Sequence, residues 1–379
     1  MTEARPFPDS PADLLRRGAP ETPILCFSPA SLRATAQRFL DGFPGQVTYA
    51  VKANPEPAVL ENLAAAGIGA FDVASLAEID LVRAIAPGAG LHYNNPVRSG
   101  VEIERAVARG VRSFGLDSAG ELARLAARVP AGAELTVRYK LPVKGAAYDF
   151  GAKFGAEPAA AADLLRAVAA AGHVPSLTFH PGTQCAPTEV WRAYVAEAAA
   201  IARAAGVEPA RLNVGGGFPS HRMMAEPPDL GAIFEAIDVA ATAAFGAARP
   251  ALVCEPGRGM VAECCTLMTR VRALRDDHVF LDDGIYGGLA EMLSMPMTDR
   301  IEVRSPEGVL RTGAPVPRTV FGPTCDSLDR LPGHPMLPED TQEDDAVLFR
   351  GMGAYSGVTA TRFNGFGVLT LATVDRLDD

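Results

Sequence analysis

Short apolar runs alternate with longer segments rich in alanine and leucine along the first two-thirds of the chain. The runs have the length and β-branched or aromatic content of strands, and they cover residues 47–53, 69–75, 90–95, 112–117, 135–141, 176–182, 211–217 and 251–257. The segments between them place apolar residues at helical spacing, as in PAVLENLAAAG (57–67). Eight strand–helix units in succession predict an α/β fold closed as a (β/α)8 TIM barrel, with a doubly wound sheet as the alternative.

The pattern changes after residue 262, where strand-like segments separated by Gly, Pro and Asp turns replace the helical ones. This predicts two domains, a barrel at 28–262 and a C-terminal β-sandwich or β-barrel domain at 263–379. The strand-like segment PETPILCF (20–27) precedes the first barrel unit. We expect it to join the β domain.

Composition narrows the possible partners. The net charge of −10 and the pI near 5.2 disfavour nucleic acid and are compatible with a small cationic substrate. The six cysteines form no CxxC pair and no zinc-ligand spacing, so we expect reduced thiols and no metal. The first ten residues do not resemble a signal peptide, and no run of about 18 apolar residues is present. We therefore expect a soluble, cytoplasmic protein without a membrane partner.

Polar residues stand at most of the predicted strand ends. In a (β/α)8 barrel the carboxyl ends of the strands surround one active site. A single polar residue there would more often be structural, but here six of the eight ends carry one or a glycine cluster. These residues are Lys52, Asp72, Arg138, His180, Gly215–Gly217 and Glu255–Arg258.

Their chemistry suggests a phosphorylated, aldehyde-bearing cofactor. Three consecutive glycines, Gly215–Gly217, can turn backbone N–H groups toward a phosphate, and Arg258 would add a charge-assisted contact. We expect Lys52 to be buried, with a lowered pKa that suits Schiff-base formation. A carboxylate such as Glu255 could keep a pyridine nitrogen protonated, so the set predicts pyridoxal 5′-phosphate (PLP). The alternative for Lys52 is a side chain that snorkels from a strand end.

Motifs along nearly the whole chain carry a family resemblance. YAVKANP, FDVAS, FHPGTQC, NVGGGFP, EPGRGMV, DDGIYGG, FGPTCDSLD and FNGF occur in this order. The chain resembles the ornithine/lysine/diaminopimelate decarboxylases of alanine-racemase fold (fold type III), and within them it is most similar to ornithine decarboxylases. The resemblance implies a PLP-binding barrel followed by a β domain, and a homodimer with shared active sites.

The resemblance also implies roles for single residues. Lys52 is then the Schiff-base lysine, His180 stacks on the cofactor ring and Glu255 pairs with the ring nitrogen. Cys325, supplied by the other subunit, returns a proton to the substrate carbon after CO2 leaves, as suits a thiol with a free pKa near 8.5. Further cofactor contacts are implied for Asp72, Arg138, Thr183, Gly215, Gly216, Gly217, Gly257, Arg258 and Tyr355.

Two acids are expected to mark the far end of the substrate. By resemblance, Asp283 and Asp326 bind the distal ammonium, with Tyr286 and Phe363 beside the substrate, because a buried ammonium needs carboxylates. The expected reaction is decarboxylation of a cationic L-amino acid, with L-ornithine (giving putrescine) ahead of L-lysine (giving cadaverine). Arginine, diaminopimelate and related amino acids stay open, because one methylene is worth only about 1–3 kcal/mol.

One motif departs from the family pattern. Ornithine decarboxylases usually have His-Val-Gly-Ser after the sixth strand, whereas this chain has His-Pro-Gly-Thr at 180–183. Thr183 keeps a hydroxyl for the phosphate. An amino-acid racemase and a non-catalytic PLP-binding regulator are less favoured, because both Lys52 and Cys325 are present.

Overall fold

The computed structural model describes residues 7–142, 145–147, 151–222, 224–297 and 299–378. The chain divides into two compact units, a barrel unit (Ala36–Pro219 and Pro228–Gly259) and a β unit (Met1–Thr35, Ser220–Pro227 and Met260–Asp379). The β unit takes in 28–35 and 260–262, which the expected limits assigned to the barrel, and also the inserted segment 220–227. In that segment Arg222 is fully buried, donates to the Met295 carbonyl (3.2 Å) and lies 3.7 Å from Glu291, which ties it to the β unit.

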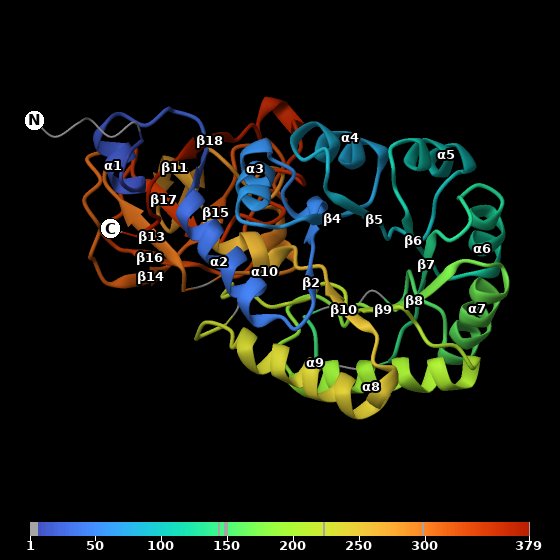
Figure 1. Cartoon of the computed structure of the whole chain (residues 1–379). Helices are drawn as coiled ribbons and strands as arrows, with labels where there is room; N and C mark the ends of the chain where they lie inside the picture. The colour runs from blue at the N-terminus through green and yellow to red at the C-terminus, as the bar shows by residue number, and fades with distance from the viewer. Residues whose placement is uncertain (1–6, 143–144, 148–150, 223, 298, 379) are drawn as a thin grey trace, which may run out of the picture. The chain divides into compact units, whose positions relative to one another are not determined.

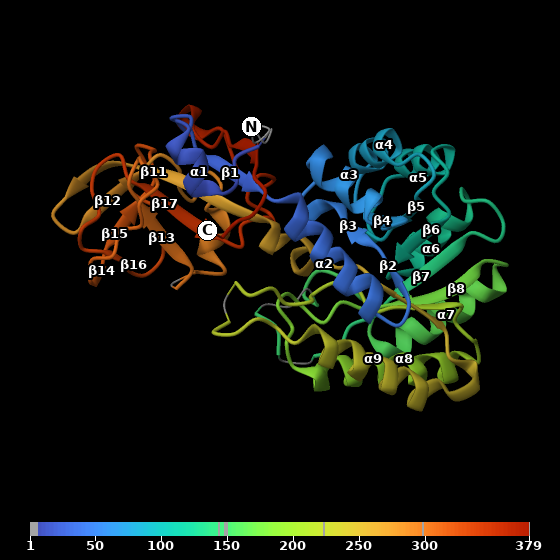
Figure 2. The same ribbon diagram turned by 60° about the vertical axis from the view of Figure 1, so that its left-hand side comes forward.

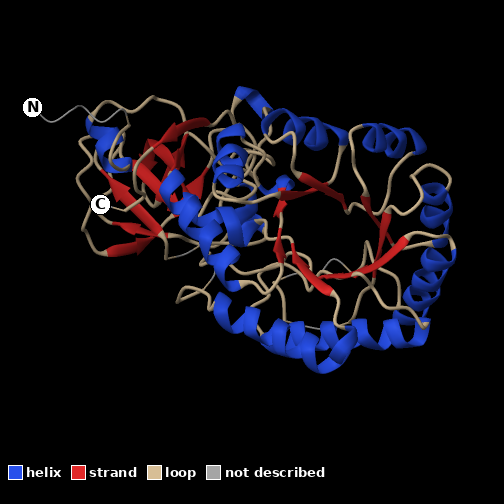
Figure 3. Cartoon of the chain, viewed as in Figure 1, coloured by secondary structure: helices blue, strands red, loops and turns tan. Residues whose placement is uncertain are grey.

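The barrel unit is built from parallel strands. They are β2 (Gln46–Val47), β3 (Tyr49–Ala50), β4 (Ala70–Val73), β5 (Gly90–Tyr93), β6 (Ser113–Leu116), β7 (Glu134–Arg138), β8 (Val174–Thr178), β9 (Arg211–Asn213) and β10 (Ala251–Cys254). Their order, β2-β10-β9-β8-β7-β6-β5-β4-β3, returns to the segment where it began. Figure 3 shows this ring of strands with helices outside it. The predicted (β/α)8 barrel is confirmed over the doubly wound sheet.

The helices of the barrel unit follow the strands in turn. They are labelled in Figure 1: α2 (Pro29–Gly42, which begins in the β unit), α3 (Pro57–Ala65), α4 (Leu76–Ile85), α5 (Gly100–Ala108), α6 (Ala119–Ala126), α7 (Pro158–Ala170), α8 (Thr188–Ala205) and α9 (Leu230–Phe245). Three of them begin with Ser-x-x-Glu, in which the serine hydroxyl accepts the N–H of the glutamate: Ser75, Ser99 and Ser118. Each such N-cap typically stabilises a helix by about 1 kcal/mol and ends the preceding loop at a defined residue.

Residues 46–53 form the seam of the barrel. β2 pairs with β10 and β3 pairs with β4, so one short segment joins the last strand to the first. Between them, the N–H and hydroxyl of Thr48 both donate to the Cys254 carbonyl, at 2.9 and 2.8 Å. The chain then enters a 3₁₀ turn, η1 (Val51–Ala53). The prediction of one continuous strand over 47–53 with a buried Lys52 was therefore wrong. The strand ends at Ala50, and the Lys52 side chain beyond it is 50% exposed.

A polar network fills the amino-terminal end of the barrel. Arg211 donates from Nε to Glu134 (2.7 Å), and Ser176 donates to the same carboxylate (2.7 Å). His92 lies 3.3 Å from Arg211, and burial together with that guanidinium lowers the pKa of His92 to about 4. The space left among these side chains is only about 10 Å³. This end of the barrel is packed.

The α9 region has the length and composition of a membrane span. The helical stretch Leu230–Ala248 is long and apolar enough to cross a membrane, contrary to the expectation that no such run is present. Core helices of soluble proteins can have the same length and composition. Ile233, Phe234 and Ile237 are buried on one face of α9. The Phe234 ring lies 5.3 Å from that of Phe39 and 5.8 Å from that of Phe218. One face of α9 therefore packs within the barrel unit.

The β unit is a sheet domain that also contains the short helix α1 (Pro11–Arg16). Its strands are β1 (Ile24–Phe27), β11 (Cys265–Arg275), β12 (His278–Leu281), β13 (Ile301–Arg304), β14 (Pro315–Pro317), β15 (Thr319–Phe321), β16 (Met336–Pro338), β17 (Ala346–Arg350) and β18 (Thr370–Thr373). The main sheet has the order β13-β17-β11-β1-β18, with β12 pairing with β11 and β15. Figure 2 labels several of these strands, among them β11, β13 and β17. The opening segment of the chain thus supplies β1, an inner strand of this sheet. Part of its core is a cluster that includes Leu15, Ile24, Cys26, Met268 and Leu348.

Candidate active site

Lys52 and Asp72 form an ion pair at the carboxyl ends of the barrel strands. Lys52 lies in η1 directly after β3, and Asp72 lies in β4, the neighbouring strand. The distance from Lys52 Nζ to Asp72 Oδ2 is 3.5 Å. Burial raises the pKa of Asp72, and the attraction of Lys52 opposes that rise. The half-exposed ammonium of Lys52 remains accessible, as a group that must react with an incoming ligand has to be.

Glu255, which follows β10, is a buried acid with two amide donors. The side-chain amides of Asn94, after β5, and Asn213, at the end of β9, both donate to Glu255 Oε1. Burial, and then repulsion from Asp72, raise the pKa of Glu255 to about 8. The attraction of Lys52 and the hydrogen bond from Asn213 oppose the rise. A cationic ligand group opposite Glu255 would favour its ionised form.

His180, which follows β8, is a neutral imidazole. Its Nδ1 accepts the N–H of Gly182 at 3.1 Å, so the ring proton resides on Nε2. Burial, followed by repulsion from Arg138 and Lys52, holds the pKa of His180 well below its usual range. A flat, uncharged ring of this kind can stack on an aromatic ligand.

Arg138 ends β7 and supplies the second cation near these acids. Burial lowers its pKa, and the attraction of Glu255, Asp117 and Asp72 opposes that effect. Its guanidinium carbon lies 5.4 Å from the centre of the Phe154 ring. The mouth of the barrel thus combines two cations with buried carboxyl groups.

The glycine cluster after β9 forms a backbone cradle. Gly215 and Gly217 have φ angles of +72° and +93°, and a Cβ on either would collide with a backbone carbonyl, of Phe179 or Gly182 respectively. A Cβ on Gly216 would lie 2.8 Å from the Glu255 carbonyl oxygen. Glycine is therefore required here for this loop to pack against the loops after β8 and β10, and a glycine loop can turn its backbone N–H groups toward a phosphate.

The remaining predicted cofactor residues of the barrel unit lie in the loops beside this cradle. Thr183 (8% exposed) follows β8, and its carbonyl accepts the N–H of Ala147 (2.9 Å). Gly257 follows Glu255, and Arg258 (5% exposed) begins the short helix α10 (Arg258–Val261). Tyr355 belongs to the β unit, where it follows β17 with a φ angle of +63°.

Cys325 and Asp326 follow β15 in the β unit. All six cysteines lie in the described part of the chain, and Cys325 alone among them is exposed. Its N–H and thiol both donate to Asn364 Oδ1, at 3.1 and 3.2 Å. Asp326 accepts the Tyr286 hydroxyl at 2.6 Å, and this bond lowers the pKa of Asp326. The Tyr286 ring in turn lies 5.0 Å from that of Phe363, so four of the predicted residues form one cluster.

Asp329 connects the two loops that carry this cluster. It accepts the N–H of Ile285 (3.0 Å) in one loop and the hydroxyl of Thr324 (2.8 Å) in the other. A Cβ on Gly284 or Gly322 would collide with its carboxylate. The position of Cys325 therefore depends on a buried side chain that belongs to no strand.

Asp283 lies inside its own loop. It is 1% exposed, and its Oδ2 accepts the N–H of Gly288 at 2.8 Å. No hydrogen bond from the described residues reaches Oδ1, which is also buried. Burial raises the pKa of Asp283 to about 7, against the backbone hydrogen bonds of Gly284 and Gly288. A cation beside Oδ1 would therefore stabilise the charged form.

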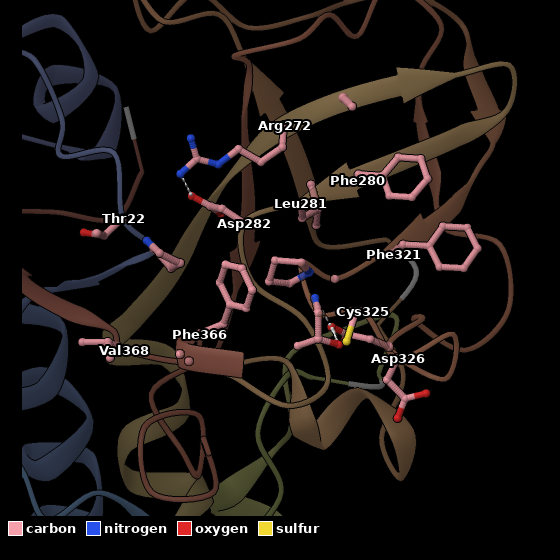
Figure 4. Close-up of a pocket in the computed structure, with 18 of the residues that line it drawn as sticks. Thr22, Arg272, Phe280, Leu281, Asp282, Phe321, Cys325, Asp326, Phe366 and Val368 are labelled. Carbon is pink, nitrogen blue, oxygen red and sulfur yellow. Dashed lines mark hydrogen bonds and ion pairs between the residues drawn. The ribbon is translucent and has the colours of Figure 1, made fainter. Parts of the chain in front are cut away.

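A cavity of about 760 Å³ opens beside Cys325 and Asp326 (Figure 4). Its wall includes the apolar side chains of Phe280, Phe321 and Phe366. A cavity of this size and mixed lining can accept part of a ligand or a protein side chain. Among residues 7–142, 145–147, 151–222, 224–297 and 299–378, no group of three or more His, Cys, Asp or Glu side chains could hold a metal ion.

Sequence reasoning missed four residues that organise these sites. Asn94 and Asn213 stand at or just after strand ends, so extending the strand-end rule to amides would have found them. Asn364 lies in the short 3₁₀ turn η5 (Phe363–Gly365) and Asp329 in a loop of the β unit, where no periodicity marks them.

The barrel sequence matches the family model for the pyridoxal binding domain of pyridoxal-dependent decarboxylases over residues 30–262. The chain belongs to this family. The expected resemblance is thereby confirmed.

Known decarboxylases are similar to this chain in sequence and in structure over most of its length. The lysine/ornithine decarboxylase of Selenomonas ruminantium is 35% identical over 330 residues, 84% of this chain and 81% of its own. SrLDC, solved in complex with PLP and cadaverine, superimposes with a TM-score of 0.82 at 32% identity, covering 96% of this chain and 92% of its own. The lysine/ornithine decarboxylase of Vibrio vulnificus, solved with cadaverine, gives 0.81 at 26% identity, covering 96% and 97%.

PLP is the cofactor of this decarboxylase family, and the barrel mouth fits it. The glycine cradle would hold the phosphate, Lys52 the aldehyde carbon, and Glu255 the ring nitrogen. The fit rests on the glycine loop, because the backbone there packs too closely for any side chain, so none stands between its N–H groups and a phosphate.

Proposed function

We propose that the chain decarboxylates a cationic L-amino acid, with L-ornithine ahead of L-lysine. The observation that carries the proposal is the pairing of the accessible Lys52 with Asp72 in the same barrel mouth as Glu255, His180 and the glycine cradle. Arginine, diaminopimelate and related cationic amino acids are the alternatives.

Bound PLP supplies an aldehyde for the substrate amine and a protonated ring that accepts the electron pair left when CO2 departs. Lys52 provides the amine that anchors the aldehyde and gives way to the substrate, and Asp72 orients that amine through the ion pair. Glu255 holds the proton on the ring nitrogen, and neutral His180 supports the face of the ring. Cys325 Sγ carries the proton that replaces the lost carboxylate.

The proposed substrate contacts come from the β unit. Asp283 presents a buried oxygen without a hydrogen bond from the described residues, and Asp326 is half-buried with a lowered pKa, which favours its charged form. Both suit a distal ammonium group, while Tyr286 and Phe363 provide an aromatic wall. The names of the relatives, lysine/ornithine decarboxylases, and cadaverine in two solved neighbours support the same chemistry.

The proposal includes a homodimer in the cytoplasm. Cys325 is exposed beside a cavity, as expected of a residue that completes the site of a neighbouring copy. Tyr355 would add a phosphate contact.

The test is a CO2-release screen of the purified enzyme with ornithine, lysine, arginine and meso-diaminopimelate, and norvaline as an uncharged control. We expect the highest kcat/KM for ornithine or lysine and little turnover of norvaline. Loss of optical rotation without CO2 would indicate a racemase. PLP binding without either reaction would indicate a regulator and contradict the proposal.

A further inference from the structure

Glu255 is held through one of its two oxygens. The amides of Asn94 and Asn213 both donate to Oε1, and no hydrogen bond from the part of the chain that the structure describes reaches Oε2. Two donors on one oxygen fix both the position and the rotation of the carboxylate. They also leave the second oxygen for a ligand.

Asn213 links Glu255 to the glycine cradle. Its Oδ1 accepts the N–H of Gly215 at 2.9 Å, which fixes the amide with its NH2 group toward Glu255. The backbone repeats the link, because the Glu255 N–H donates to the Gly215 carbonyl at 2.8 Å. The group that would face the ring nitrogen and the loop that would hold the phosphate are thus connected through one side chain.

Asn94 links Glu255 to Asp72. Its amide donates to Glu255 Oε1, and the same side chain lowers the pKa of Asp72, while the two acids repel each other. Asn94 therefore separates two buried carboxyl groups that the reaction needs in defined places.

We propose that Asn94 and Asn213 are positioning residues that orient Glu255 through Oε1 and so present Oε2 to the ring nitrogen of PLP. The inference rests on the proposed function for its chemistry. Without these donors, the buried carboxylate loses its hydrogen bonds and prefers the neutral form. A neutral Glu255 no longer stabilises a protonated ring.

The experiment uses holoenzyme reconstituted with PLP that carries 15N in the ring. In the wild type, the 15N resonance should report a protonated ring nitrogen near neutral pH. In Asn94→Leu and Asn213→Leu, which keep the number of side-chain heavy atoms but remove the donors, the resonance should move toward the unprotonated position. We also expect kcat to fall about 10–100-fold with KM within about threefold, because the lost effect acts on the transition state.

Asn95→Leu is the matched control. Asn95 neighbours Asn94 in the chain, but its amide donates to the Ala74 carbonyl (3.4 Å). The 15N resonance of PLP bound to Asn95→Leu should match that of the wild type. If leucine prevents folding or PLP binding, Asn94→Ala and Asn213→Ala relieve the packing and should give the same shift.

An unchanged, protonated 15N resonance in PLP-loaded Asn94 and Asn213 variants overturns the inference, whatever their activity. The resonance does not depend on the substrate. A shift in an enzyme that decarboxylates no amino acid would therefore support the positioning role while the proposed function fails.

Discussion

The barrel unit and the β unit position their functional residues by different means. In the barrel, Lys52, Asp72, Arg138, His180 and Glu255 meet because parallel strands end at the same edge. In the β unit, Cys325 and its neighbours come from loops, which single side chains such as Asp329 hold in place. The difference teaches that the backbone fixes the cofactor half of the site, whereas individual hydrogen bonds fix the half proposed to contact the substrate.

The largest effect is expected in the barrel. Lys52→Ala should lower turnover by about 10³-fold or more, because this amine anchors the cofactor aldehyde. Borohydride reduction of the wild type should attach a pyridoxyl group to Lys52, as shown by a peptide map. Lys140→Ala, which removes another lysine near the end of a barrel strand, should keep the label and the activity. A label on any other lysine would refute the assignment.

The next effect tests the β unit through specificity. Asp283→Asn should lower kcat/KM for ornithine and lysine by about 10²-fold or more, because it removes a buried partner of the distal ammonium. Norvaline, which has no charge there, should be affected little. Asp282→Asn is the control, since Asp282 accepts the Arg270 N–H (2.7 Å) and has no proposed substrate role. Equal losses for ornithine and norvaline would show that Asp283 only shapes the loop.

Asp283 also predicts a dependence of stability on pH. Its pKa is raised from 3.8 to about 7, so the folded state binds the proton more tightly than the unfolded one. The resulting stabilisation is complete below about pH 4 and is lost as the pH rises through 7. Between pH 5 and 8, urea denaturation of the wild type should show about 2–3 kcal/mol more loss of stability than that of Asp283→Asn. If the free energy of unfolding changed equally with pH in the wild type and in Asp283→Asn, the raised pKa of Asp283 would be contradicted.

Mixing subunits tests whether the two halves of a site come from different chains. Lys52→Ala and Cys325→Ala should each be crippled. After subunit exchange, half of the dimers would be mixed, each with one intact site of two, so activity should recover to about a quarter of the wild type. Lys52→Ala mixed with itself is the control. No recovery after demonstrated exchange would place both residues in one chain's site.

The smallest effect concerns a loop contact. Asn364 accepts both the N–H and the thiol of Cys325. Asn364→Ala should lower kcat several-fold with little change in KM, because the thiol remains but is less well oriented. Thr361→Ala is a suitable comparison, since Thr361 lies in the same loop and donates to the Tyr286 carbonyl (3.0 Å). A similar kcat in both variants would argue against an orienting role.

Periodicity was enough to predict the barrel, and strand ends were enough to bring Lys52, Asp72, Arg138, His180 and Glu255 into one mouth. The periodicity gave the wrong element at 47–53, because an apolar run without Gly or Pro does not reveal where one strand ends and its neighbour begins to pair with a different strand. Lys52 is half-exposed because the strand ends at Ala50 and the lysine lies in the turn η1 that follows.

The β unit was less predictable. Its strands could be expected from their composition, but their pairing order depends on contacts distant in sequence, such as β1 with β18. Asp329 and Asn364 act through loop geometry, which no local pattern encodes. The roles of Cys325, Asp326 and Tyr355 came only from resemblance and remain proposals.

The seam at Thr48 has a consequence for biosynthesis. Thr48 bonds to Cys254, 206 residues later in the chain. A ribosome must therefore make nearly the whole barrel before the first strand finds its final neighbour, and contacts of such long range form slowly. Lys52 stands four residues beyond Thr48, so the lysine proposed to anchor the cofactor should not reach its native place before Cys254 has been made. The acquisition of yellow cofactor colour should thus be a late event, and its rate should report closure of the ring in refolding experiments.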